Sequence, residues 1–441
     1  MKAYAQPPGL PRNPAAGLTI NGAAVETLAT GTADFSIVAM DPEDFPARVE
    51  INAPPTTRIR PLSAGIPCSA ADGRISFTLP RPMKLSIDPS DGSKPHYFFA
   101  NPPETAPPAP GTPGVIAMRP GEITEIPLLE MEDGQTLYLP GGSVLKGRIH
   151  VKGKSDIRIC GHGIFDGGFD GVTSGGKKPS ILLEHCVRAL VEDITMIRPC
   201  GWMLVPAACR GVTVRNLKQI GEVLCSDGID ILGSSDVLVE DCFLHNNDDC
   251  IAVKAFDLGG KNLDGVRVDA RKNVENVIVQ RCTLANAEGG NAVEIGHELA
   301  VDSVRGVTFR DIDILHVHGH GAVFAIHNCD RATISDILYE NIRIEHCYDK
   351  LIDFRITTSF YSTDAERGRI RGVVLRDIHW DRSRYNPGYT ISIIRGADAD
   401  HAVDDVRITD FFLDGRRVEN LDELEIAATH CNGLRLENTA G

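Results

Sequence analysis

The sequence lacks any long apolar run. No stretch of its 441 residues approaches the roughly 20 apolar residues that a membrane-spanning helix needs. Its first residues, Met1-Lys-Ala-Tyr-Ala-Gln-Pro-Pro8, contain no apolar signal core. We therefore expect no membrane contact and a cytoplasmic protein as written, or a secreted or periplasmic one if the sequence has been trimmed.

An excess of positive charge is also missing. The formal net charge of -15 argues against partners such as nucleic acid and anionic membrane surfaces, and weighs mildly against a polyanionic substrate. With 42% hydrophobic residues, the chain is long enough to bury a large core in one or two domains.

Paired cysteines are absent as well. The twelve cysteines are scattered singly, and several, such as Cys242, Cys250 and Cys282, follow an Asp or Arg at expected strand positions. Such residues behave as small buried hydrophobes, so we expect free thiols in a reducing compartment. No Cys/His cluster has zinc-like spacing, so we expect no metal and no cofactor.

The sequence also lacks helical periodicity. Beyond Glu130 no amphipathic run reaches the roughly ten residues that a helical repeat would need. Instead a short β-branched pattern recurs at 189–194, 212–217, 237–242, 277–282, 307–312 and 373–378. Its matching polar positions are separated by 23, 25, 40 and 30 residues: Asp193, Asn216, Asp241, Arg281 and Asp311. Equal coils with unequal loops indicate an all-β solenoid, a β-helix.

The N-terminal part has a different pattern. Short alternating segments at 34–39, 74–79 and 83–87 are separated by Pro and Gly turns, which favours a small antiparallel sandwich. A proline-rich segment, 101–113, follows it. We predict an N-terminal β-sandwich domain over 1–125 and a β-helix domain over 126–441.

Two acidic segments carry the candidate chemistry. Cys225-Ser-Asp-Gly-Ile-Asp230 is followed by Asn247-Asp-Asp-Cys-Ile-Ala-Val-Lys254. If both are strands with Ile229 stacked on Ile251, Asp227 lies beside Asp249, roughly 5 Å away. Like charges that close hold one carboxyl protonated near neutral pH, which gives an acid and a base in one cleft.

The apolar phase also predicts an outward-facing polar stripe on one sheet. The inward pairs are Ile229/Ile231, Ile251/Val253, Val293/Ile295, Phe324/Ile326 and Ile352/Phe354. The stripe that they leave facing solvent consists of Asp230, Lys254, Glu294, His327, Asp353 and Arg355. It is either a sugar-binding groove or an ordinary solvated strand face.

At these motifs the chain resembles glycoside hydrolase family 28, the polygalacturonases, and more distantly family 49, the dextranases and isopullulanases. Ser226-Asp-Gly-Ile-Asp230 resembles the family's Asn-Thr-Asp-Gly-Ile-Asp, and Asp248-Asp-Cys-Ile-Ala-Val-Lys254 resembles its Asp-Asp-Cys-Ile-Ala-Ile-Lys. The segments 137–147 and 161–167 resemble those that open its β-helix. The resemblance covers about 125–420. It implies a right-handed parallel β-helix, preceded by a sandwich like that of family 49.

The resemblance also implies roles. Asp248 would be the general acid, and Asp227 with Asp249 would activate water with inversion. Inversion requires roughly 6.5 to 9.5 Å between acid and base, so we expect some of the three carboxylates to lie farther apart than neighbouring strands. Trp202 falls where the family places an aromatic residue one coil earlier, so it is a candidate sugar platform or a core residue.

Two departures from the family concern substrate binding. The family's Gly-His-Gly has two candidates, Glu288 in Ala287-Glu-Gly-Gly290 and His297 in Ile295-Gly-His-Glu298. Its Arg-Ile-Lys, which grips a galacturonate carboxylate, is absent from 321–327, where His327 is the polar substitute. Arg355, one coil further, either restores positive charge or forms a structural ion pair. We therefore expect an oligo- or polysaccharide other than plain polygalacturonate.

Two other functions stay open. A β-helix lyase or epimerase would act on uronic acids, and it needs a cationic or metal clamp on the substrate carboxylate. A carbohydrate-binding β-helix without catalysis is the second, since fold alone confers no activity. Sugar identity, linkage, endo or exo action and oligomeric state are not determined by the sequence, although we expect the loops 256–272 and 360–369 to wall the groove.

Overall fold

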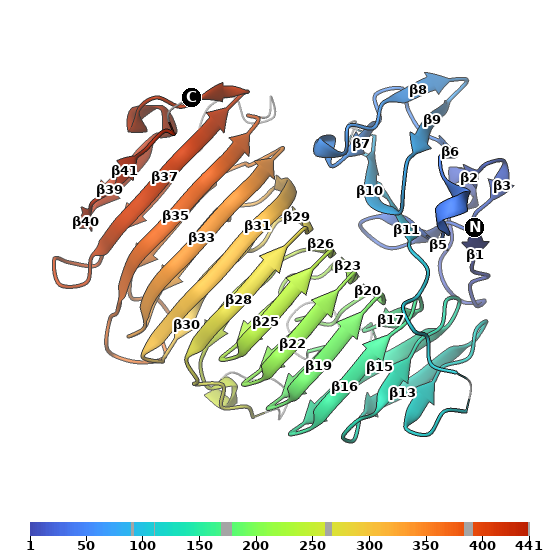
Figure 1. Ribbon diagram of the computed structural model, residues 1–441, viewed down its shortest axis with the longest axis horizontal. Coiled ribbons are helices and arrows are strands. Elements are labelled where there is room, and N and C mark those ends of the chain that lie inside the picture. Colours follow the sequence, from blue (N-terminus) through green and yellow to red (C-terminus); the bar gives the residue numbers. More distant parts are fainter. Residues whose placement is uncertain (90–91, 110, 169–178, 261–266, 383–390, 440–441) are drawn as a thin grey trace.

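The computed structural model describes residues 1–89, 92–109, 111–168, 179–260, 267–382 and 391–439. Figure 1 shows a long stack of parallel strands from β13 to β37 and a smaller N-terminal group of sheets beside it. No helix of the described ranges is long or apolar enough to cross a membrane. The helical segments there are short 3-10 turns: η1 (Pro14–Ala16), η2 (Pro42–Asp44), η3 (Leu62–Ala64), η4 (Leu258–Gly260) and η5 (Leu421–Leu424).

Two N-terminal sheets form a sandwich, as the alternating segments predicted, but it is not wholly antiparallel, since the strands at 34–39 and 96–101 pair in parallel. The first sheet contains β1 (Lys2–Ala3), β4 (Leu28–Ala29), β5 (Asp34–Ala39), β7 (Arg58–Arg60), β10 (Met83–Asp88) and β11 (His96–Asn101). The second contains β2 (Thr19–Ile20), β3 (Ala23–Ala24), β6 (Ala47–Asn52), β8 (Cys68–Ala71) and β9 (Arg74–Leu79). Apolar residues of both sheets, such as Phe98 and Val49, share one core.

The centre of the first sheet is buried on both faces. Strands β5 and β11 are buried along almost their whole length, without the alternation expected of a half-exposed strand. The second face of the sheet contacts the β-helix, where Phe35, Tyr97 and Phe99 join a core that includes Ile220 and Phe243. This contact fixes the sandwich against the solenoid.

The β-helix is built from parallel strands that return to the same columns on each coil. The column that carries the candidate site contains β18 (Ile181–Glu184), β21 (Leu204–Ala207), β24 (Ile229–Leu232), β27 (Ile251–Ala255), β30 (Val293–Leu299), β32 (Ala322–Asn328), β34 (Lys350–Ile356), β36 (Ser392–Arg395) and β39 (Ile426–Thr429). We call it the site column.

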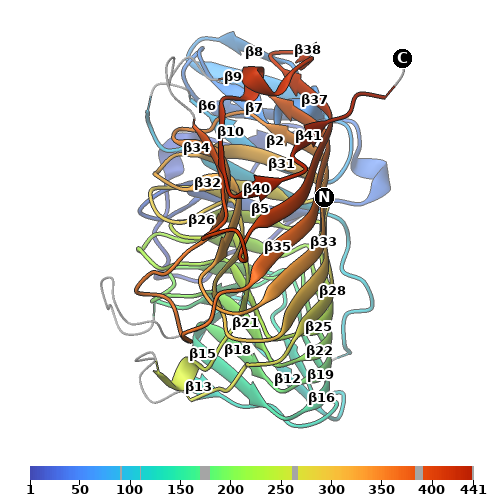
Figure 2. The same ribbon diagram turned by 90° about the vertical axis from the view of Figure 1, so that its left-hand side faces the viewer.

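A second column contains the sequence repeat. Its strands are β14 (Thr136–Tyr138), β16 (Ser155–Cys160), β19 (Val187–Glu192), β22 (Arg210–Arg215), β25 (Ser235–Glu240), β28 (Val274–Gln280), β31 (Ser303–Val317), β33 (Thr333–Ile344), β35 (Arg369–Trp380) and β37 (Val403–Leu413). Figure 2 views this stack from its C-terminal end.

A third column faces the sandwich and contains β17 (Ile164–Asp166), β20 (Thr195–Ile197), β23 (Lys218–Ile220), β26 (Phe243–Asn246) and β29 (Thr283–Asn286). The remaining strands of the large sheet are β12 (Val115–Ala117), β13 (Ile123–Leu129), β15 (Val144–Lys152), β38 (Arg416–Arg417), β40 (Cys431–Asn432) and β41 (Arg435–Leu436). The fold predicted from the repeat, a parallel β-helix, is confirmed.

The polar positions of the repeat are the corners of the coils. Asp193, Asn216, Asp241, Arg281 and Asp311 all have positive φ, between 48° and 69°. Aspartate and asparagine tolerate this left-handed conformation better than most side chains. The repeat therefore marks a left-handed corner in each of these coils.

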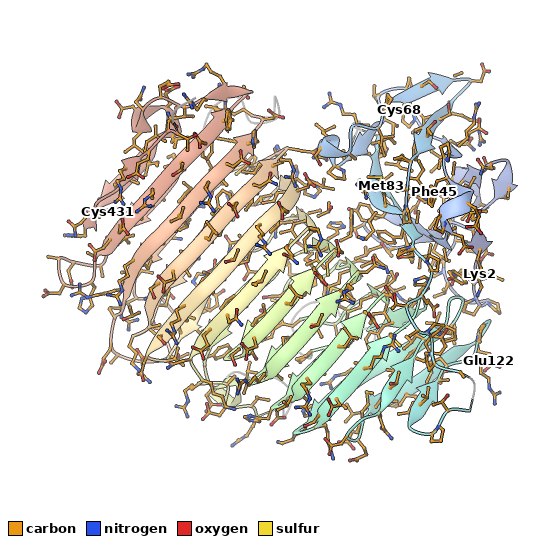
Figure 3. All side chains as sticks on the ribbon, viewed as in Figure 1. Lys2, Phe45, Cys68, Met83, Glu122 and Cys431 are labelled. Carbon is orange, nitrogen blue, oxygen red and sulfur yellow. The ribbon has the colours of Figure 1, made fainter. Side chains whose placement is uncertain are left out.

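The cysteines are all free thiols. Nine of the twelve are buried, as predicted for small apolar residues. Figure 3 labels two of the others, Cys68 on the N-terminal sheets and Cys431 near the last coil.

Strand pairing changes partners between β11, which ends at Asn101, and β12, which begins at Val115 in the large sheet. The division into domains at 125/126 stays a prediction.

Candidate active site

The two acidic segments lie on neighbouring coils in the predicted register. Ile229 of β24 pairs with Ile251 of β27, and the amide of Gly228 donates to the carbonyl of Asp249 at 2.8 Å. Asp227 and Asp249 therefore each precede the first inward residue of their strand by two positions. Both line a cleft of about 390 Å³.

The three candidate catalytic carboxylates converge in this cleft. One oxygen from each of Asp227, Asp248 and Asp249 lies within 4.8 Å of the others. Asp227 and Asp249 are buried, whereas Asp248 is half-buried and the most accessible of the three. The structure therefore contradicts the expectation that some of them are farther apart than neighbouring strands, since their nearest oxygens are not separated by roughly 6.5 to 9.5 Å.

This spacing suits a shared water molecule. A water forms hydrogen bonds to carboxylates of about 2.7 Å, so one molecule can contact two oxygens that are up to roughly 5 Å apart. Oδ1 of Asp227 is buried and receives no hydrogen bond from the protein. It can accept one from such a water.

Lys254 forms ion pairs with carboxylates of two neighbouring coils. Its Nζ donates to Oδ2 of Asp227 at 2.9 Å and to Oδ1 of Asp230 at 2.8 Å, and lies 3.8 Å from Oδ2 of Asp249. Burial opposes the charge on this amine, but Asp227, Asp230 and Asp249 outweigh it and keep the Lys254 pKa well above its usual value.

Two carboxyl groups have strongly raised pKa values. Burial, followed by the charge of Asp227, raises the pKa of Asp230 well above its ordinary value. Burial also raises the pKa of Asp249, and the charges of Asp248, Glu294 and Asp227 add to this effect. The site can therefore hold a proton near neutral pH while a neighbouring carboxylate is charged.

The predicted stripe needs one correction. Its inward partners all lie in the main apolar core, as predicted. However, Asp230, Lys254, Glu294, His327 and Asp353 are at most 5% exposed and do not face solvent. Their opposite charges pair with one another across the coils, which offsets part of the cost of burial.

His327 is the centre of the second half of the stripe. Its Nδ1 lies 2.8 Å from Oε2 of Glu294, and its Nε2 lies 3.3 Å from Oδ2 of Asp353. Burial opposes the charge on this imidazole, but the two carboxylates outweigh it and raise the His327 pKa to about 9. Arg355 forms an ion pair with Asp353 at 2.6 Å, as the structural alternative predicted.

Aromatic rings border the carboxylates. Trp202 lines the cleft but is 6% exposed, in a core with Phe256, and Nζ of Lys254 lies 4.6 Å from its ring centre. It is therefore both a core residue and a cation–π partner. On the other side, the ring of His297 stacks between those of His327, at 4.4 Å, and Tyr361, at 4.7 Å.

Only one of the two loops that were expected to wall the cleft contributes a described residue to it. Tyr361 of the 360–369 loop lines the cleft, as predicted for that loop. In the 256–272 loop, Phe256, Leu258, Val268 and Ala270 pack with Trp202 in a buried core. No described residue of that loop lines the cleft, and 261–266 fall outside the described residues.

The two candidates for the family's histidine position do not contact Asp249 through any described hydrogen bond. Glu288 is exposed at the rim, where its amide donates to Oδ1 of Asn247. Burial lowers the pKa of His297 to about 4. Asn291, which sequence reasoning missed, contacts Asp249 instead: its backbone N and its Nδ2 each lie 2.8 Å from Asp249 Oδ1.

A signal for Asn291 exists in the sequence. Asn291 precedes Val293 by two residues, as Asp227 precedes Ile229 and Asp249 precedes Ile251, and these three apolar residues are in register. Asp227, Asp249 and Asn291 therefore occupy one position on three successive coils.

Among the described residues, two clusters have the residue types of a metal site. They are the three aspartates and the group Glu294, His297 and His327, each with ligand atoms within 4.8 Å of one another. Lys254 already supplies a positive charge to the first cluster, and both ring nitrogens of His327 already face carboxylates. The residues present therefore suit acid–base chemistry that uses their own protons.

Comparison with curated proteins gives two polygalacturonases as relatives. The chain is 26% identical over 196 residues to an endo-polygalacturonase of Sclerotinia sclerotiorum, covering 40% of this chain and 50% of that one. It is 28% identical over 195 residues to a polygalacturonase of Penicillium griseoroseum, covering 40% and 51%. The chain spans about half the length of these curated relatives.

A solved structure shares the whole architecture. Dex49A from Penicillium minioluteum matches with a TM-score of 0.68 over 99% of this chain and 96% of that one, at 13% identity. At this identity the likeness concerns the fold alone, and it includes the N-terminal sheets.

The family assignment comes from the β-helix. The model of glycosyl hydrolases family 28 matches residues 148–379, which include both acidic segments and the cleft. This match spans more than half of the 441 residues. The chain therefore belongs to glycosyl hydrolase family 28.

Proposed function

We propose that this protein hydrolyses glycosidic bonds of an oligo- or polysaccharide made of neutral or only partly acidic sugars. The observation that carries the proposal is the convergence of Asp227, Asp248 and Asp249 in one cleft, with one oxygen of each within 4.8 Å of the others. Adjacent carboxyl groups with different environments supply the acid and the base that glycoside hydrolysis needs.

The accessibility of the three groups supports their roles. Asp248, which is half-buried at the cleft, donates a proton to the glycosidic oxygen as the bond from that oxygen to the anomeric carbon breaks. A water between Asp227 and Asp249 attacks the anomeric carbon from the opposite face and gives up a proton to one of these carboxylates. The product then has the inverted configuration, as in the family as a whole, although the nearest carboxylate oxygens lie closer here than the roughly 6.5 to 9.5 Å usual for inversion.

The charge of the cleft supports a neutral substrate. Six carboxyl side chains line it: Asp227, Asp248, Asp249, Glu288, Glu298 and Asp353. Its cationic groups have carboxylate partners, since Lys254 pairs with Asp227, Lys350 with Asp349, Arg355 with Asp353, and His327 with Glu294. A chain of uronic acids would meet repulsion here, without the charge-assisted bonds that hold a substrate carboxylate.

The test is a screen of the wild type and Asp248→Asn against neutral and acidic polysaccharides and oligosaccharides. We expect new reducing ends from neutral or partly acidic substrates with the wild type, and a loss of at least about 10³-fold with Asp248→Asn, as for removal of a catalytic acid. Asp236→Asn is the matched control, because Asp236 is half-buried on β25, does not line the cleft, and contacts Arg210 and Asn276.

The other possible outcomes would each contradict part of this proposal or indicate a different function. Full activity of Asp248→Asn would refute the assignment of the acid, and preference for polygalacturonate would refute the neutral substrate. A product absorbing near 235 nm, roughly where an unsaturated uronide absorbs, would indicate a lyase. Binding of a glycan without cleavage, unchanged in Asp227→Asn, would indicate a binding module. The anomeric configuration of the first product, measured by NMR, tests inversion.

A further inference from the structure

The side chain of Asn291 has all of its hydrogen-bonding groups in use. Its Oδ1 accepts from the backbone N of Ala322 on the next coil at 2.8 Å. Its Nδ2 donates to Oδ1 of Asp249 at 2.8 Å and to Oε2 of Glu294 at 2.9 Å. Because the amide of Ala322 is a donor, the oxygen of Asn291 has to face it, and both N–H groups have to face the carboxylates.

The two oxygens of Asp249 are consequently in different environments. Oδ1 accepts from the backbone N and from Nδ2 of Asn291, each at 2.8 Å. Oδ2 lies 3.8 Å from Nζ of Lys254 and has no such pair of donors in the described contacts. Two donors on Oδ1 leave Oδ2 as the oxygen that can take a proton.

Gly290 allows this contact. It has a φ of +64°, and a Cβ at this position would lie 2.1 Å from the backbone N of Asp249. No other residue type permits such a close approach without a shift of the backbone. The chain turns here in a way that brings Asn291 directly onto the catalytic segment.

We infer that Asn291 is a positioning residue, which orients Asp249 so that Oδ2 receives the proton of the attacking water. The inference rests on the proposed function. Asn291 acts through Asp249, and it joins Asp249 to the pair formed by Glu294 and His327, which lie 2.8 Å apart. The amide thus connects the catalytic carboxylates with the buried charges of the neighbouring coils.

The test compares Asn291→Ala with Asn291→Asp on a substrate that the wild type cleaves. We expect kcat to fall about 10²-fold with KM within roughly twofold, because misplacement of a reacting group affects the chemical step more than binding. Loss of the donor removes a stabiliser of the charged carboxylate, so the acidic limb of the pH–rate profile should move up by about one pH unit.

Asn291→Asp distinguishes the loss of the hydrogen-bond donor from the loss of side-chain volume. Aspartate has the size of asparagine but cannot donate to two carboxylates, so it should damage catalysis at least as much as alanine. Asn216→Ala is the matched control, since Asn216 is also buried and donates from Nδ2 to a carboxylate, that of Asp193 at 2.8 Å. It should leave the pH profile of kcat unchanged.

The other possible outcomes would overturn either the inference about Asn291 or the proposed function. An unchanged pH profile and kcat in both Asn291 variants would overturn the inference. If these variants do not fold, Asn291→Ser, whose hydroxyl donates one hydrogen bond, should give a smaller shift in the same direction, and no shift would overturn the inference. Absence of hydrolysis by the wild type on every glycan would instead refute the proposed function.

Discussion

Lys254 shows how a single residue makes an acidic site stable. It lies among Asp227, Asp230 and Asp249 from two coils, and it is 5% exposed. Removing one member of a buried ion pair leaves the other charges without compensation, which costs more than the pair contributes. The charge of Lys254 therefore offsets part of the cost of burying these carboxyl groups, while the pKa values of Asp230 and Asp249 stay raised.

Replacing Lys254 by methionine should lower the free energy of unfolding by about 3–5 kcal/mol at pH 7. The loss should be smaller at pH 5, because protonation of the carboxyl groups removes their mutual repulsion. Urea unfolding at both pH values measures this difference. Adding Asp230→Asn to the variant should restore part of the stability, and an equal loss at both pH values would contradict the explanation.

A surface pair provides the control for this variant. Lys146 contacts Glu125 at 2.9 Å, and the side chain of Glu125 is 58% exposed. Lys146→Met should cost less than about 1 kcal/mol, since exposed pairs contribute little.

At the scale of the element, the strands that contain the sequence repeat share a second column of residues with left-handed backbone, one residue on each coil. Asp236, Asn276, Gly306, Asp336 and Gly372 occupy it on successive coils, with φ between 55° and 64°. Glycine alternates there with Asp and Asn, the side chains that best tolerate this conformation. The backbone shape, more than any contact, determines the residue type.

Asp336→Val should therefore destabilise the protein by about 1–2 kcal/mol, because a β-branched residue is strained at positive φ. Asp336→Gly should stay within about 0.5 kcal/mol of the wild type, since Gly306 and Gly372 are the neighbouring residues in this column. Chemical denaturation measures both. Asp336 is exposed, so a large loss in the glycine variant would show that a side-chain contact matters here.

At the scale of the whole molecule, histidines lie where the sandwich meets the β-helix. The hydroxyl of Tyr97 on β11 lies 3.0 Å from Nδ1 of His245 on β26, and burial lowers the pKa of His245 to about 4. Nearby, Arg60 of β7 contacts Glu345, which follows β33, at 2.6 Å. The fold thus favours the neutral form of His245.

Stability should consequently fall as the pH drops from about 6.5 to about 4, the interval in which the unfolded chain binds a proton and folded His245 does not. Over this interval His245 alone accounts for about 3 kcal/mol, since one pKa unit corresponds to about 1.4 kcal/mol. The interval closes near pH 4 because folded His245 is then protonated too.

His245→Gln should make this pH dependence less steep, because glutamine does not titrate, while other histidines with lowered pKa values, such as His297 and His346, keep part of it. Urea unfolding between pH 4 and 8 measures it, with His430→Gln, on the exposed surface, as the control that keeps the wild-type slope. An unchanged slope in His245→Gln would show that other groups set the acid sensitivity.

The sequence by itself determined the β-helix, the register of Ile229 on Ile251 and the meeting of Asp227 with Asp249. These features follow from a pattern that is local to each coil, because strand alternation and corner residues repeat with the chain. The family motifs, Asp227, Asp248 and Asp249, belong to this locally encoded part.

The tertiary structure alone decided which polar residues are buried and what they contact. The stripe from Asp230 to Asp353 is outward by phase, yet it is buried, and Asn291 and Tyr361 reach the cleft through a turn and a loop of irregular length. The loss of alternation in β5 and β11 has the same origin, since their second face packs on coils far away in the chain. Strand phase gives the direction of a side chain, but contacts with distant coils and loops decide whether it meets solvent, another charge or a core.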